Sequence, residues 1–151
     1  MERIPSFTVD HTTLQKGMYI SRLDPPDTYT YDIRMKLPNQ GDYLSTGAMH
    51  TFEHLFATYA RNSRWKHEVI YVGPMGCRTG FYLITRGLSH PEAIKLVQAS
   101  MEFIRDFEGD IPGASPVECG NYRDQDLPAA KALAADMATI LAHWNEKQLQ
   151  Y

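Results

Sequence analysis

Apolar and polar residues alternate along the chain with two different periods, which together predict a mixed fold. Alternation at every second residue, with many aromatic and β-branched side chains, predicts strands at 17–23, 28–37, 68–72 and 81–85. Apolar residues at spacings of three and four predict helices at 45–62, 89–104 and 127–148. Because short connections favour antiparallel pairing, we expect an α+β fold, a two-layer sandwich with an antiparallel sheet and helices packed on one face.

The ends of the predicted elements carry signals of their own. Ser45 or Thr46 can cap the first helix, and Ser89 with Glu92 forms a capping-box pattern at the start of the second. His90, directly after that cap, is expected at the surface. The chain before the first predicted strand begins with about seven residues that we expect to form an extended arm.

Composition limits the classes of protein that the chain can belong to. With 151 residues, 43% of them hydrophobic, the chain is long enough for one domain over residues 1–151. The net charge of −3 and the scattered basic residues argue against a nucleic-acid or membrane-surface partner and favour a small soluble ligand. The sequence has no apolar run of the about 18 residues that a membrane span needs, so we expect a cytoplasmic protein.

A His-x-x-Glu-His run in the first predicted helix is the strongest sign of chemistry. His50 and His54 are four residues apart, so a helix places their imidazoles side by side, where both can bind one cation. Glu53 lies on the same broad face and can act as a proton shuttle beside a metal ion. This order of residues is found in one class of metallohydrolases.

A catalytic zinc or iron site needs a third protein ligand and one position left open for substrate or water. The two cysteines, Cys77 and Cys119, are the candidates. A thiolate from Cys119 would complete a His₂Cys site, and the glycine that follows it suits a bent loop. Cys77 lies in a glycine-rich segment beside Arg78, and a neighbouring cation favours a reactive thiolate. Thiol chemistry or metal ligation is favoured over a disulfide in a reducing compartment.

Three segments resemble the core motifs of the S-ribosylhomocysteine lyases, the bacterial LuxS family that makes the precursor of autoinducer-2. They are residues 50–54 (HTFEH), 73–82 (GPMGCRTGFY) and 118–121 (ECGN). Residues 6–11 (SFTVDH) and 32–34 (DIR) are also similar to the family. The resemblance extends over nearly the whole chain and implies an α+β fold and a homodimer with two active sites at the subunit interface.

The resemblance also implies which residues carry the function. The implied metal ligands are His50, His54 and Cys119, which hold one Fe²⁺ per subunit, replaceable by Zn²⁺ or Co²⁺. The implied acid/base pair is Glu53 and Cys77. The implied substrate contacts are Ser6, His11 and Arg34. The implied reaction converts S-ribosylhomocysteine to homocysteine and 4,5-dihydroxy-2,3-pentanedione by carbonyl migration and β-elimination, for which a metal ion acts as Lewis acid.

The residues alone leave other interpretations open. The His-x-x-Glu-His order also fits a hydrolase or peptidase in which the glutamate activates water. A structural metal site would be closed, with both cysteines bound to the ion. Cys119 could be an inert buried thiol, and Cys77 a small residue required between glycines. The remaining three candidates have structural alternatives as a polar arm residue (Ser6), a loop histidine (His11) and a sheet-face arginine (Arg34).

Overall fold

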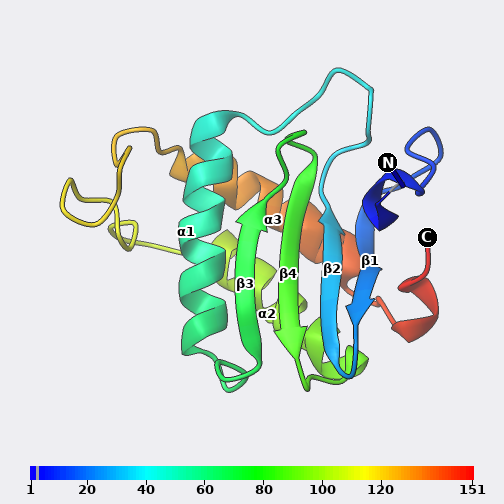
Figure 1. Ribbon diagram of the computed structural model, residues 1–151. Helices are drawn as coiled ribbons and strands as arrows, with labels where there is room; N and C mark the ends of the chain where they lie inside the picture. The colour runs from blue at the N-terminus through cyan, green and yellow to red at the C-terminus, as the bar shows by residue number, and fades with distance from the viewer. Residues whose placement is uncertain (3) are drawn as a thin grey trace.

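The computed structural model describes residues 1–2 and 4–151, which form one sheet and a layer of helices (Figure 1). The strands are β1 (Gly17–Asp24), β2 (Thr28–Arg34), β3 (Val69–Pro74) and β4 (Gly80–Arg86). The α-helices are α1 (Thr46–Asn62), α2 (His90–Asp106) and α3 (Leu127–Leu141). Two short 3₁₀ helices are η1 (Pro5–Phe7) and η2 (Glu146–Gln148).

The sheet is antiparallel throughout, with strand order β1-β2-β4-β3. In β2, Tyr31 and Ile33 pair with Leu83 and Phe81 of β4, and all four side chains are buried in the core. Residues that alternate with these point to the opposite face of the sheet. Asp32 is one of them, and it lies opposite Tyr82 in the register.

The helices form the second layer, as the sequence predicts. Figure 1 shows α2 and α3 behind the sheet and α1 running alongside β3, while the other face of the sheet carries no α-helix and has η1 at its β1 edge. Phe52 of α1 packs on Phe81 of β4 with ring centroids 4.9 Å apart, and Phe56 joins the same cluster. The predicted α+β sandwich with an antiparallel sheet is therefore confirmed.

The two predicted helix starts have different outcomes. Ser45 caps α1, since its side chain accepts a hydrogen bond from the Ala48 N–H, as predicted. The prediction of a capping box at α2 is wrong. The Ser89 hydroxyl donates to the Glu92 carboxylate and makes no hydrogen bond to the helix backbone. His90 is half-buried rather than at the surface, and its Nδ1 lies 2.7 Å from the hydroxyl of Tyr31.

Both ends of the chain differ from the sequence-based expectation. The last part of the predicted N-terminal arm forms η1, in which the Phe7 N–H donates to the Ile4 carbonyl over 2.9 Å, so residues 5–7 are not extended. The last helix ends at Leu141 instead of continuing to residue 148. Trp144 donates from its indole to the Met18 carbonyl of β1, and the Leu149 carbonyl accepts from the Ile20 N–H. These two hydrogen bonds hold the end of the chain along β1.

Candidate active site

Helix α1 presents two histidines to the same point in space. His50 and His54 are both half-buried, and their rings meet edge to face with centroids 4.6 Å apart. The two Nε2 atoms lie 3.0 Å from each other. The spacing of four residues, close to one helical turn, produces this pairing as predicted.

The second nitrogen of each ring fixes its tautomer. His50 Nδ1 donates to the Asp124 carbonyl over 2.8 Å, and His54 Nδ1 donates to the Pro112 carbonyl over 2.7 Å. Because a carbonyl oxygen only accepts, both protons lie on Nδ1, and the Nε2 lone pairs of the neutral rings face each other. Two lone pairs at this separation repel unless a cation lies between them, and metal-binding histidines are oriented in this way.

Cys119 brings a third donor to the same point from the loop between α2 and α3. Its Sγ lies 3.3 Å from His50 Nε2, and the three ligand atoms all lie within 4.8 Å of one another. The Cys119 N–H donates to the Ser115 carbonyl over 3.0 Å, which holds the turn that carries the sulfur. Two imidazoles and a thiolate suit Zn²⁺ or Fe²⁺ and leave at least one position for an exchangeable ligand. The cluster therefore fits a metal ion.

Gly113 allows the loop to approach the histidines closely. Its φ of +72° is a left-handed conformation that favours glycine. A Cβ at this position would lie 3.2 Å from His54 Nδ1. The carbonyl that orients His54 belongs to the preceding residue, Pro112, so the backbone conformation of this turn and the orientation of the imidazole depend on each other.

Glu53 is half-buried on the helix that carries both histidines. Within the part of the chain that the structure describes, no hydrogen bond or ion pair occupies its carboxylate. A carboxylate next to His54 in sequence, without an internal partner, is available to move protons near the cluster.

Cys77 lies at the tip of the β3–β4 hairpin and is exposed. The turn is held by backbone bonds from the Arg78 N–H to the Met75 carbonyl and from the Leu44 N–H to the Arg78 carbonyl, each 2.9 Å. Cys77 Sγ lies 3.0 Å from Thr79 Oγ1. Both cysteines of the chain are free thiols, as predicted.

One cavity of about 600 Å³ brings Cys77 together with the predicted substrate-contacting residues, which are Ser6, His11 and Arg34. His11 Nδ1 lies 2.9 Å from the Val9 carbonyl and so carries the proton, which leaves Nε2 as an acceptor. The other polar residues of the lining are Asn39, Tyr43, Thr79 and Tyr82. Residues far apart in sequence thus converge around one thiol.

Arg34 is the most constrained of these residues. It is buried, and its Nη2 lies 2.5 Å from Asp32 Oδ2, while Nη1 donates to Thr79 Oγ1 over 2.5 Å. Burial lowers the pKa of Arg34, but the Asp32 carboxylate outweighs it and the pKa is raised, so the guanidinium stays charged. The Tyr151 hydroxyl donates to the same Asp32 oxygen over 2.8 Å.

The metal cluster and the Cys77 cavity lie on different sides of α1. The loop that carries Cys119 extends on the side of α1 away from the sheet, whereas the β3–β4 hairpin lies on the opposite side (Figure 1). His50, His54 and Cys119 are absent from the lining of the Cys77 cavity. Within one chain, the predicted site residues therefore form two separate groups.

Comparison with known proteins supports the same family as the motifs. The profile of the family described as S-Ribosylhomocysteinase (LuxS) matches residues 4–148. The S-ribosylhomocysteine lyase of Phocaeicola vulgatus is 46% identical, covering all of this chain and 98% of the relative. That of Clostridium beijerinckii is 47% identical and that of Clostridium acetobutylicum 44%, each covering all of this chain and 99% of the relative.

The chain belongs to the LuxS family. All residues of the two groups lie within the segment that the family profile matches. Among the described residues, no helix is both long enough and apolar enough to cross a membrane.

Three groups of this LuxS chain were not identified from the sequence. The carbonyls of Pro112 and Asp124 orient the histidines, and backbone atoms give no sequence signal. Asp32 is two residues from Arg34 on a predicted strand, so their shared face could have predicted the ion pair. Thr79 lies in the quoted motif around Cys77, yet only the folded hairpin shows its hydroxyl between Arg34 and the sulfur.

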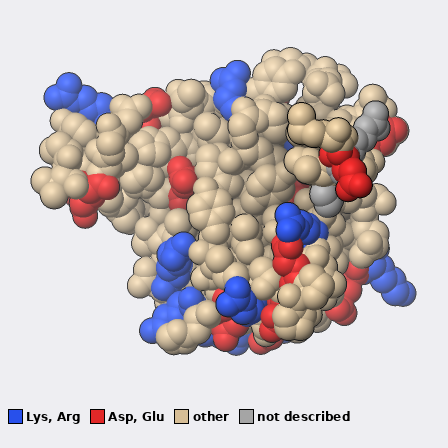
Figure 2. Space-filling view, in the orientation of Figure 1, with Lys and Arg blue, Asp and Glu red and all other residues tan. Residues whose placement is uncertain are grey.

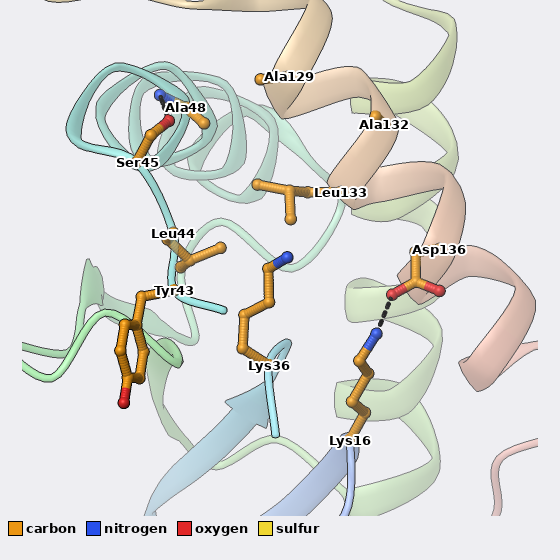
Figure 3. Close-up of a pocket in the computed structure, with 10 residues that line it drawn as sticks. All are labelled: Lys16, Lys36, Tyr43, Leu44, Ser45, Ala48, Ala129, Ala132, Leu133 and Asp136. Carbon is orange, nitrogen blue, oxygen red and sulfur yellow. Dashed lines mark hydrogen bonds and ion pairs between the residues drawn. The ribbon is translucent and has the colours of Figure 1, made fainter. Parts of the chain in front are cut away.

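A second cavity of about 430 Å³ lies between α1, α3 and the segment that follows β2 (Figure 3). Figure 3 shows Lys36 reaching between Leu44 and Leu133, while Lys16 pairs with Asp136 over 2.7 Å. Lys36 is also neutralised, by an Asp42 oxygen at 2.7 Å. None of the predicted site residues lines this cavity, and Leu44, which does, donates through its N–H to the Arg78 carbonyl in the Cys77 turn.

Proposed function

We propose that this chain cleaves S-ribosylhomocysteine to homocysteine and 4,5-dihydroxy-2,3-pentanedione, the autoinducer-2 precursor, and that residues 1–151 act as one domain. The observation that carries this proposal is the coexistence of an open three-donor cluster with a separate free thiol in a cavity. Family membership gives the substrate class, since the matched relatives are named S-ribosylhomocysteine lyases.

His50, His54 and Cys119 would hold the metal ion, which we propose to be Fe²⁺, replaceable by Zn²⁺ or Co²⁺, at one ion per subunit. The Nδ1 hydrogen bonds support this role, because they leave both Nε2 atoms free to ligate. When bound, the ion supplies Lewis acidity that makes the C–H next to a sugar carbonyl easier to deprotonate.

The acid/base work falls to Cys77 and Glu53. Cys77 takes protons from sugar carbons and returns them, since an exposed thiol beside the Arg34 guanidinium can carry negative charge. Glu53 moves protons among oxygens and assists the departure of the homocysteine thiolate, since it is half-buried on α1 and precedes His54 in the sequence. Two bases on different segments can reach different sides of one substrate.

Ser6, His11 and Arg34 are proposed to position the substrate. Ser6 and His11 offer hydrogen-bonding groups on the wall of the Cys77 cavity. Both terminal nitrogens of Arg34 already donate one hydrogen bond each, to Thr79 and to Asp32. Fewer N–H groups therefore remain for a substrate carboxylate or hydroxyl. Its charge, more than bidentate binding, is then its main contribution.

We further propose that two chains form a homodimer and that each active site combines the metal cluster of one chain with the Cys77 cavity of the other. The separation of the two groups by α1 supports this arrangement. The sheet face that carries no α-helix also suits a second copy: its middle, over β3 and β4, is mostly uncharged, and charged side chains gather along its lower edge (Figure 2). Tyr71 lies on this face, opposite Ile84, and is 47% exposed.

The partner classes follow from the same surface and composition. With a net charge of −3, we propose a small-molecule substrate, no nucleic-acid or membrane partner, and a cytoplasmic location. A structural metal site bound by both cysteines is disfavoured, because Cys77 makes a hydrogen-bond contact with Thr79 and is not in the cluster of ligand atoms. A hydrolase would leave the cavity around Cys77 without a role.

The direct test is to load the purified protein with Fe²⁺ or Co²⁺, add S-ribosylhomocysteine and follow free thiol by a colorimetric reagent. We expect homocysteine release at a rate far above that of metal-free protein. A metal-loaded protein that releases no thiol would overturn the proposed function. Mixing Cys77→Ala chains with Cys119→Ala chains tests the shared site, because only a site built from both chains regains activity, to about one quarter of wild type per chain.

A further inference from the structure

An unbroken series of polar contacts connects the C-terminal Tyr151 to the thiol of Cys77. The Tyr151 hydroxyl donates to Asp32 Oδ2, which also accepts from Arg34 Nη2. Arg34 Nη1 donates to Thr79 Oγ1, and that oxygen lies 3.0 Å from Cys77 Sγ. Three of the members, Asp32, Arg34 and Thr79, are at most 3% exposed.

The direction of these hydrogen bonds is fixed by their chemistry. Arginine has only donors, so Thr79 Oγ1 must accept from Arg34. The positive guanidinium orients the hydroxyl dipole with oxygen toward Arg34 and hydrogen away from it. The hydroxyl hydrogen is then free to point at Cys77 Sγ, which makes sulfur the acceptor. An acceptor sulfur is best satisfied as a thiolate.

The opposite end of the series holds Arg34 in place. Asp32 neutralises the guanidinium in a buried setting, where an unpaired charge would be costly. The Tyr151 ring stacks on Tyr19 with centroids 5.0 Å apart, which places its hydroxyl on the Asp32 oxygen. Burial, followed by the neighbouring Asp32 charge, raises the pKa of Tyr151, so the hydroxyl remains a donor throughout the neutral range.

We propose that Thr79 is a positioning residue of this enzyme: it passes the field of an Arg34 guanidinium, itself fixed by Asp32 and Tyr151, to Cys77 through one directed hydrogen bond. This inference rests on the proposed role of Cys77 as the base. Thr79 is 3% exposed, and its proposed action is through Cys77. It keeps Cys77 Sγ in the acceptor state and in one orientation within the cavity.

The test compares Thr79→Val, which removes the hydroxyl and keeps the shape, with Thr79→Ser, which restores it. In metal-loaded protein, the rate of iodoacetamide alkylation at pH 7 is followed on the tryptic peptide 67–78, which separates Cys77 from Cys119. Loss of a charge-assisted hydrogen bond predicts about a tenfold or greater fall in this rate for Thr79→Val. The alkylation rate of Thr79→Ser should be within about threefold of the wild-type rate, because the hydrogen bond is restored.

Thr85→Val is the matched control, because it removes a buried hydroxyl from β4, the strand that follows Thr79, at a site paired with Tyr29 near the far end of that strand. Its alkylation rate should equal that of wild type. In turnover, Thr79→Val should lower kcat while KM and metal content stay near the wild-type values. A merely structural role would instead lower the melting temperature and leave the alkylation rate of the folded protein unchanged.

The outcomes separate this inference from the proposed function. Equal alkylation rates in wild type and Thr79→Val would overturn the role of Thr79, whatever the activity of Cys77→Ala. Full lyase activity in Cys77→Ala would overturn the proposed base instead. Tyr151→Phe should lower the alkylation rate by a smaller factor, since Asp32 still holds Arg34, and an unchanged rate would remove Tyr151 from the series.

Discussion

His50 Nε2 lies 3.3 Å from Cys119 Sγ, although the two residues are 69 positions apart in the sequence. The loop between α2 and α3 closes onto α1 to make this contact. Removing the sulfur would leave only two imidazoles on one helix, which is too few for a tight metal site.

We expect Cys119→Ala to lose bound metal and lyase activity together. A lost thiolate should lower metal affinity by orders of magnitude. Metal content after dialysis, measured by elemental analysis, checks this, with Cys77→Ala as the control that keeps the metal. A Cys119→Ala protein with a full complement of metal would remove Cys119 from the cluster.

Gly113→Ala should weaken metal binding without unfolding the protein. The new Cβ meets His54 Nδ1 at 3.2 Å, and a left-handed conformation costs alanine about 1–2 kcal/mol. A competition titration with a chromogenic chelator should show a roughly tenfold loss of affinity on that scale. Gly120→Ala is the matched control, since no atom lies within 4 Å of its Cβ position. Equal affinity in both variants would contradict the account.

Much of the fold could be predicted because it depends on local patterns. The Ser45 cap, the strands and the α1 stripe around Phe52 follow from spacing and turn chemistry. The end of α3 could not, because the residues up to 148 have no helix-breaking residue. The chain leaves the helix to let Trp144 and Leu149 bond to β1, and such long-range bonds are invisible to local patterns.

The same distinction holds for the site. His50 and His54 were predictable because a helix fixes their spacing, whereas Cys119 required a search for a missing ligand. The contact of Thr79 with Arg34 depends on the pairing of Arg34 with Gly80 across β2 and β4. Register between strands decides such contacts, and alternation along one strand shows which face a residue is on but not which residue lies opposite it.

Glu53→Gln should keep the metal and lose turnover. The amide has nearly the same shape, but it cannot take up and release a proton, so we expect a fall of roughly 10²-fold or more in kcat. The kcat is measured from the rate of thiol release by metal-loaded protein, and the metal content of the same sample is determined. Metal loss in this variant would make Glu53 a ligand rather than a base.

The stability of the fold should decrease in alkaline solution because of Tyr31. Burial raises the pKa of Tyr31 above the ordinary value near 10. Below pH 10, both the folded and the unfolded chain keep the proton and the contribution is complete. Above it the unfolded chain loses the proton first, so the free energy of unfolding falls by up to about 1.4 kcal/mol per pH unit.

Tyr31→Phe should therefore flatten the dependence of the free energy of unfolding on pH between about pH 10 and 11.5, measured by urea titration. Ser100→Ala provides the control, because it removes a buried hydroxyl that does not ionise in this range, so the slope should stay unchanged. A slope for Tyr31→Phe equal to that of the unmodified protein would mean that Tyr31 ionises equally in both states.

The central claim is that Cys77 removes protons from carbon while a separate His₂Cys cluster holds the metal. It is tested most directly by incubating metal-loaded Cys77→Ala with S-ribosylhomocysteine in deuterated buffer and following substrate C–H signals and free homocysteine by NMR. For Cys77→Ala we expect full metal content, no exchange of carbon-bound hydrogen and no homocysteine. The unmodified protein should exchange carbon-bound hydrogen and release homocysteine. Deuterium incorporation and thiol release by Cys77→Ala within about tenfold of the unmodified protein would contradict it, since that is below the usual contribution of a general base.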